Sequence, residues 1–149
     1  MTNLELINAF YGLEEFQKRE KEELKKTGKR LLQNHVMIAY KINKNKKEIA
    51  EALQPYNETR EEINREFRDL TKEQETYNTE QELAKKEKRP SRPVQMIFLE
   101  GKKKGDYNKK IADLCNLETD FEPTKIQAIE LEGLEITSEE LGLLMFMVS

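Results

Sequence analysis

Few residues in this sequence could perform covalent or metal chemistry. His35 is the only histidine and Cys115 the only cysteine of the chain. A reactive thiol needs a base beside it and a histidine-based metal site needs further ligands, whereas no histidine lies near Cys115 in the sequence. We therefore predict a packing role for His35 and a buried, inert thiol for Cys115. The alternatives are a pH-sensitive or ligand role for His35 and a nucleophilic role for Cys115.

Lysine-rich segments could perform a second kind of chemistry, the binding of anions. The segment 101–106 (GKKKGD) superficially resembles a phosphate-binding loop, but it lacks the required spacing and the Ser or Thr that would hold magnesium. The simplest interpretation is a lysine-rich turn. The functional alternative is a basic contact for nucleic-acid backbone or an acidic protein surface. The candidate residues are Lys85, Lys86, Lys88, Arg89, Arg92, Lys102, Lys103 and Lys104.

Acidic side chains give no sign of an active site. Glu118, Asp120 and Glu122 are close in sequence, but they lack the spacing and the central glycine of a calcium loop. Nothing resembles a pair of catalytic carboxylates in an apolar cleft, where one pKa could be raised for acid–base catalysis. We therefore predict no metal, no cofactor and no enzymatic activity.

Composition and charge favour an elongated helical protein. Charged residues make up 37% of the 149 residues and hydrophobic ones 36%. The 26 basic and 29 acidic residues are interspersed and leave a net charge of −3, which suits solvated helix faces better than a nucleic-acid binder. A single cysteine fits a reducing compartment, and we find neither a secretion signal nor an apolar run of about 20 residues. We expect a soluble, cytoplasmic protein without a membrane segment.

The strongest pattern is a heptad repeat from Leu32 to Tyr77. Ten of its fourteen a and d positions are apolar or aromatic, and the residues between them are mostly polar. This spacing predicts a long amphipathic helix with a narrow, coiled-coil-like apolar stripe, which a partner from this chain or another must bury. The stripe residues predicted to contact a partner are Ile42, Lys46, Ile49, Leu53, Tyr56, Arg60, Ile63 and Phe67.

Pro55 interrupts this helix, because proline removes one backbone donor and clashes with the preceding turn. The heptad register is unchanged on either side, which favours a kinked but continuous helix. The alternative is a helical hairpin that turns at 54–57, where Asn57 could cap the second arm.

Helix ends are marked at both ends of the chain. Thr2 with Glu5, and Thr137 with Glu140, have the spacing of capping boxes, which predicts helices that begin at Asn3 and just after Thr137. Gly28 predicts the end of the first helix, because glycine tolerates the left-handed conformation found there.

The C-terminal part is predicted to be a small strand–helix–strand–helix module. Its strands are expected at 94–99 and 125–131 and its first helix at 107–117, with Asp106 as the cap. The fold class is therefore mainly α with a small β component (α+β). We predict a helical arm at 1–84, a polar linker at 85–93 and the module at 94–149, packed on the first helix as one domain overall.

Three segments resemble an uncharacterised family of short phage and prophage proteins of Gram-positive bacteria. They are HVMIAYKINKNKKEIAEAL, NETREEINREF and IELEGLEITSEELGLLMFMV, and the similarity covers about two-thirds of the chain, with 71–93 fitting poorly. A proline such as Pro55 is not expected in the family's helix, so this chain departs from the pattern there. The resemblance implies a viral origin and a host bacterial cytoplasm. It supplies no catalytic or binding residues.

Our first functional hypothesis is a non-enzymatic phage protein that binds another protein through the long helix. The partner would be a second copy, a phage component or a host protein. The alternative is an inhibitor of a host defence or nucleic-acid enzyme, anti-CRISPR-like or of another anti-defence kind. A weaker alternative, direct nucleic-acid binding through the basic residues, is disfavoured by the acid excess.

Overall fold

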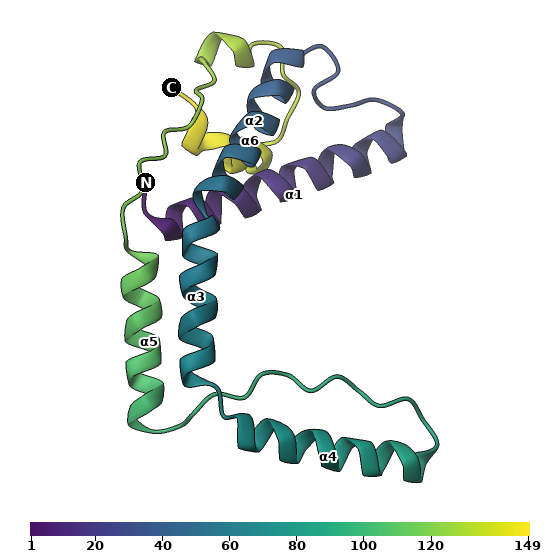
Figure 1. Cartoon of the computed structure of the whole chain (residues 1–149). Coiled ribbons are helices and arrows are strands. Elements are labelled where there is room, and N and C mark those ends of the chain that lie inside the picture. Colours follow the sequence, from purple (N-terminus) through teal and green to yellow (C-terminus); the bar gives the residue numbers. More distant parts are fainter. The chain divides into compact units, whose positions relative to one another are not determined.

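The computed structural model describes all 149 residues and is mainly helical, as predicted (Figure 1). The longer helices are α1 (Asn3–Thr27), α2 (Val36–Ala52), α3 (Gln54–Phe67), α4 (Leu70–Glu87) and α5 (Lys102–Cys115). The short helix α6 (Ser138–Leu144) and two 3₁₀ turns, η1 (Ala128–Leu131) and η2 (Met145–Met147), follow near the C-terminus. The chain forms two compact units, one of residues 1–56 with 115–149 and the other of residues 57–114. These bounds differ from those drawn from the sequence, which placed a linker at 85–93.

Helix α1 begins and ends where the sequence predicted. The Thr2 hydroxyl accepts from the Glu5 N–H while the Glu5 carboxylate accepts from the Thr2 N–H, so two unpaired donors at the helix start are satisfied. Gly28 closes the other end at φ 72°, and its N–H donates to the Leu24 carbonyl. The buried side of α1 carries Leu6 and Phe16 among other apolar residues.

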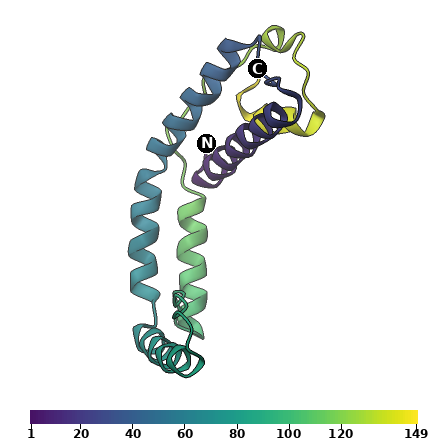
Figure 2. The ribbon, with the colours of Figure 1, turned by 90° about the vertical axis from the view of Figure 1, so that its right-hand side faces the viewer.

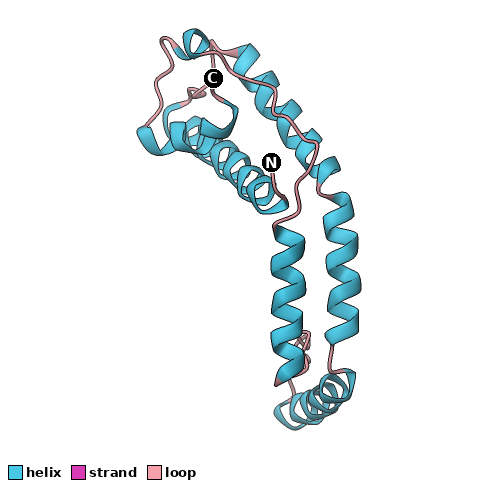
Figure 3. Ribbon diagram, turned by 90° about the vertical axis from the view of Figure 1, so that its left-hand side faces the viewer, coloured by secondary structure: helices cyan, strands magenta, loops and turns pink.

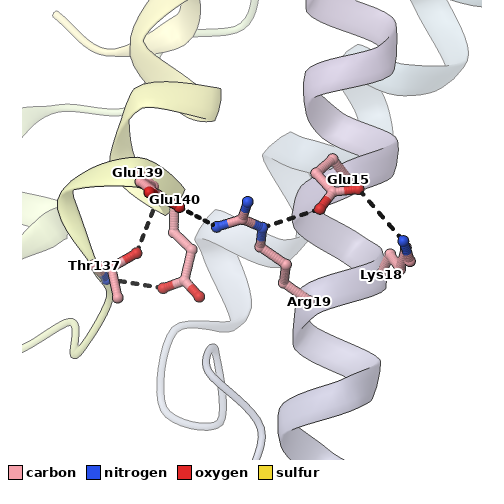
Figure 4. A network of polar contacts seen from close by, with 6 residues as sticks. All are labelled: Glu15, Lys18, Arg19, Thr137, Glu139 and Glu140. Carbon is pink, nitrogen blue, oxygen red and sulfur yellow. Dashed lines mark hydrogen bonds and ion pairs between the residues drawn. The ribbon is translucent and has the colours of Figure 1, made fainter.

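Helix α6 packs on α1 because a glycine leaves room for its backbone. A Cβ built on Gly12 would lie 3.2 Å from the Leu143 carbonyl oxygen, which is tighter than ordinary packing allows. Figure 4 shows a second link, in which Arg19 of α1 lies between Glu15 of the same helix and Glu139 at the start of α6, with N···O distances of 3.1 and 3.0 Å. The predicted capping box of α6, Thr137 with Glu140, is present in the same figure.

The buried face of α2 collects segments from both ends of the sequence. Ile38, Ile42 and Ile49 are buried, and α2 crosses α1 (Figure 1). Asn45 lies on the same buried face of α2, between Ile42 and Ile49 in the sequence, and is itself fully buried. Its side chain pairs with both backbone groups of Thr124: Nδ2 donates to the carbonyl at 2.9 Å, and Oδ1 accepts from the N–H at 2.8 Å. This amide therefore acts as a short piece of backbone and fixes the position of the segment after α5 on α2.

In the unit of residues 57–114, helices α3 and α5 lie side by side (Figures 1 and 2). Phe67 of α3 meets Tyr107 of α5 edge to face, with ring centroids 5.7 Å apart. The Tyr107 hydroxyl donates to Asn64 Oδ1 at 2.9 Å, and Lys110 pairs with Glu66 at 2.8 Å. An aromatic contact flanked by polar pairs thus joins the two helices.

Residues 89–99 form an extended segment that α4 holds through two carboxylates. Glu80 accepts from the Arg92 N–H and pairs with the Arg89 guanidinium, while Glu73 accepts from the Ile97 N–H and pairs with Arg68. The charge-assisted bond to Arg89, then the bond from the Arg92 N–H, lowers the pKa of Glu80 to about 2. Side chains of a helix thus satisfy backbone donors that a sheet would otherwise pair.

The predicted strand–helix–strand–helix module is wrong in its strands. Figure 3 shows helices and loops only, and residues 94–99 and 125–131 make isolated bridges, Phe98 with Arg68 and Ile126 with Val148. The predicted turn at 101–105 is also wrong, since α5 begins at Lys102, five residues before the predicted start. Each of these short apolar runs forms only one isolated bridge, whereas a sheet needs several consecutive residue pairs between neighbouring strands.

The predicted long helix is broken at two places. Leu53 alone separates α2 from α3 and keeps helical dihedrals, so the chain does not form the alternative hairpin at 54–57. A second break, at Arg68–Asp69, was not predicted; Asp69 accepts from the Lys72 N–H and caps α4. His35 precedes α2, and its side chain makes no capping bond.

Removing the Asn45 amide should destabilise the fold. Asn45→Ala leaves both Thr124 backbone groups without their partner, and we expect a loss of about 1–3 kcal/mol in the free energy of unfolding. Urea denaturation followed by circular dichroism measures this change. Asn43→Ala, on the same helix, removes only the exposed hydrogen bond that its Oδ1 accepts from Gln17 Nε2 and should cost less than about 1 kcal/mol. Equal costs for the two variants would show that the buried amide has no special role.

The Glu80 bond should make the extended segment sensitive to acid. Because the folded pKa of about 2 lies below the ordinary 4.5, the stabilisation is complete above pH 4.5 and is lost as the pH falls towards 2. In an NMR titration the Arg92 amide proton should shift with a midpoint well below 4.5, and Glu80→Gln should abolish that shift. Glu82→Gln, at an exposed position of α4, should leave it unchanged. A midpoint near 4.5 in the unmodified chain contradicts this role.

Candidate protein-binding surface

The predicted partner-binding stripe is largely covered by the chain itself. Its apolar members Ile42, Ile49, Leu53, Tyr56 and Phe67 are buried, Ile63 and Lys46 are half-buried, and Arg60 is exposed. The Lys46 ammonium lies 3.3 Å from a Glu14 carboxylate oxygen and 5.5 Å from the centre of the Phe10 ring. The stripe therefore supplies the core, and a binding surface must be sought among residues that face outward.

The outward side of α2 carries large apolar side chains in place of the expected polar ones. Val36, Met37 and Tyr40 are exposed to 73%, 59% and 58%. Successive residues of a helix are turned by about 100°, so Val36 and Tyr40 lie on the side opposite Ile38, and Met37 lies on the flank of that side. We call the six residues Val36, Met37, Tyr40, Asn43, Lys44 and Lys47 the outer face of α2.

Charged residues continue the outer face toward the C-terminal end of α2. A shallow hollow of about 420 Å³ is lined by Tyr40, Asn43, Lys44, Lys47, Glu48 and Glu51. Lys44 lies 3.8 Å from Glu48 and Lys47 lies 3.8 Å from Glu51, which are weak surface pairs along the helix. An apolar group beside a polar, solvated edge is the arrangement of many protein interfaces.

The outer face is held in place by the contacts on the rest of α2. Lys41 forms an ion pair with Glu130 of η1, in which both side chains are mostly buried. The pKa of Glu130 is lowered, first by this bond to Lys41 and then by the N–H of Gln127, so the carboxylate stays charged at neutral pH. With Asn45 on one side and Lys41 on another, α2 presents Val36, Met37 and Tyr40 on a fixed scaffold.

The predicted basic contact is split in the structure. Lys85, Lys86 and Lys88 lie at the end of α4, whereas Lys102, Lys103 and Lys104 lie at the start of α5, well apart in Figure 1. Arg89 is mostly buried in ion pairs with Glu80 and Glu87, which raise its pKa, and the Arg92 side chain is exposed. The two clusters do not form one continuous basic face.

The remaining candidates for chemistry are dispersed. His35 is half-buried and borders a polar hollow that also contains Glu23 and Glu135. The Cys115 thiol is half-buried and lies 3.8 Å from the Tyr56 hydroxyl. No three of the His, Cys, Asp and Glu side chains, Glu118 among them, gather as metal ligands. None of the helices combines the length and apolar character needed to cross a membrane.

No family model matches the chain, and neither the curated proteins nor the solved structures compared with it include a match. The resemblance to short phage proteins stays a prediction from the sequence.

The outer face does not follow from the heptad repeat, because only the a and d positions of the repeat predict contacts with a partner. Val36, Met37 and Tyr40 fall at the e, f and b positions of the same repeat, where a coiled coil carries polar residues. Three apolar residues at such positions, within a span of five residues, are a pattern in the sequence that could have indicated this surface.

Replacing the outer face should leave the fold intact. Because its side chains are exposed, the triple variant Val36→Gln, Met37→Gln, Tyr40→Gln should change the free energy of unfolding by less than about 1 kcal/mol. Ile42→Ala, on the buried side of the same helix, should cost about 2–5 kcal/mol. Urea denaturation of the two variants measures both. A triple variant as unstable as Ile42→Ala would show that the outer face belongs to the core.

Proposed function

We propose that this chain acts without enzymatic activity, by binding another protein on the outer face of α2. The observation that carries the proposal is the exposure of Val36, Met37 and Tyr40, each to more than half, on consecutive turns of one helix. Apolar side chains gathered in water are unfavourable by about 25 cal/mol for each Å² that a partner could bury. Such patches mark interaction sites more often than chance exposure.

The composition of the outer face suits recognition of a second protein surface. Tyr40 and Met37 are residue types enriched at the centres of interfaces, and the tyrosine adds a hydroxyl that can reach a polar partner. Lys44 and Lys47 on one side, with Glu48 and Glu51 next to them, give the surface charges of both signs. A partner with an apolar centre and a mixed-charge rim would be complementary to it.

We keep the partner classes inferred from the sequence, a second copy, a phage component or a host protein, as part of this proposal. The inhibitor and nucleic-acid hypotheses gain no specific support, because the basic residues they require are divided between the ends of two helices and Arg89 is already paired. Protein binding through an amphipathic helix thus remains the proposal, with its surface on the outer side of α2 and not on the buried stripe.

The test is affinity capture from a bacterial lysate with matched variants. A specific partner should be retained by the unmodified chain and lost at least tenfold by the triple variant Val36→Gln, Met37→Gln, Tyr40→Gln. The control Leu4→Gln, Tyr11→Gln replaces exposed apolar residues of α1 and should retain the partner. Sedimentation velocity with the same variants tests the second copy as partner. A partner or self-association unaffected by the triple variant would overturn the proposal, as would a strict monomer that captures nothing.

A further inference from the structure

A second concave site lies on α3, in the unit of residues 57–114. It is a hollow of about 560 Å³ lined by Asn57, Arg60, Glu61, Asn64, Arg65, Arg68 and Met96. Six of these residues follow one another at helical spacings of three and one, so five of them share one side of α3, and Arg68 follows directly after its last residue, Phe67. Met96, in the extended segment held by α4, supplies the remaining wall. No residue is shared with the outer face of α2.

The charge of this hollow is positive and only partly neutralised. Arg68 is occupied by Glu73, at 2.8 Å, and Arg65 has a long contact of 3.6 Å with Glu61, in which both side chains are largely exposed. Arg60 makes no ion pair in the chain and is exposed. The hollow is thus lined by three guanidinium groups and one carboxylate, that of Glu61. The guanidinium groups of Arg60 and Arg65 are available to a ligand.

Asn64 provides the observation that points to an acceptor ligand. The residue is only 8% exposed, and its Oδ1 accepts the Tyr107 hydroxyl at 2.9 Å, which fixes the orientation of the amide. Its Nδ2 has no acceptor within the chain. The Nδ2 atom is not fully buried, so it reaches the solvent of the hollow and can donate to an acceptor from outside. The Asn57 amide, two turns earlier, also has no partner in the chain.

We propose that this hollow binds a phosphate dianion, either inorganic phosphate or the monoester group of a larger small molecule. Arginine presents donors in a planar fork that fits phosphate oxygens, and the amides of Asn57 and Asn64 can add further donors. With Arg68 paired to Glu73, the charges of Arg60, Arg65 and Glu61 leave one net positive charge in the hollow, and both free guanidinium groups can donate to phosphate oxygens. The volume of about 560 Å³ is that of a small-molecule site, and Met96 gives an apolar wall for the rest of a larger ligand.

The test is an NMR titration of the full chain at constant ionic strength. Inorganic phosphate and glycerol 3-phosphate should shift the Asn64 side-chain amide and the Arg60 Nε–H signals saturably, and acetate should bind at least tenfold more weakly. Tighter binding of glycerol 3-phosphate than of phosphate would show that the site takes a larger ester. Equal binding of the two would show that it takes the phosphate group alone.

The matched variants separate this site from general attraction of anions. Arg60→Gln, Arg65→Gln removes two exposed charges and should weaken phosphate binding at least tenfold while the spectrum stays that of the folded chain. Lys85→Gln, Lys86→Gln removes the same charge at the exposed end of α4 and should change the affinity less than twofold. Equal weakening by both variants, or equal shifts with phosphate and acetate, would overturn the proposal. Neither result bears on protein binding by α2.

Discussion

The fold of residues 1–56 and 115–149 depends on covering the apolar side of α2. Ile38, Ile42 and Ile49 are buried there, and the segments that cover them come from α1 and from the last part of the chain. Apolar burial alone has little directionality, so it does not fix where a connecting segment lies. Asn45 supplies that direction, because a buried amide that pairs with both backbone groups of Thr124 admits one placement of the segment. Ile126, two residues later, then meets the end of the chain through bonds to Met147 and Ser149.

This use of α2 accounts for the placement of the candidate binding surface. A helix buried on one side and anchored by Lys41 and Asn45 has one side left for solvent, and on that side the chain carries Val36, Met37 and Tyr40. Nothing in the folding of the unit requires apolar residues there. On α3 the side toward α5 carries Phe67, Asn64 borders both that side and the hollow, and Arg60 and Arg65 lie on the side away from α5. In both helices the packed side explains the structure, and the side left over carries the proposed functions.

The unit of residues 57–114 shows how an extended segment is stabilised without a sheet. Glu73 and Glu80 lie seven residues apart, two turns of α4, and each accepts a backbone N–H from the segment while holding an arginine. These carboxylates accept backbone N–H groups of residues 89–99 that a neighbouring strand would otherwise pair, and their arginine partners keep them ionised. Val94 and its apolar neighbours therefore have the composition of a strand without forming one.

The sequence by itself determined the helical class, the capping boxes at Thr2 and Thr137 and the helix end at Gly28, because these depend on residues within one turn of each other. It also marked a kink at Pro55, although the favoured continuous helix is broken at Leu53. Only the tertiary structure decided which residues fill the core: Asn45 and Ile38 are buried where the heptad placed Lys46 and Ala39. The absence of a sheet was likewise decided there, because a strand exists only if a second one lies beside it. A repeat of apolar residues requires a cover, but the contacts with distant segments determine that the cover is this chain itself.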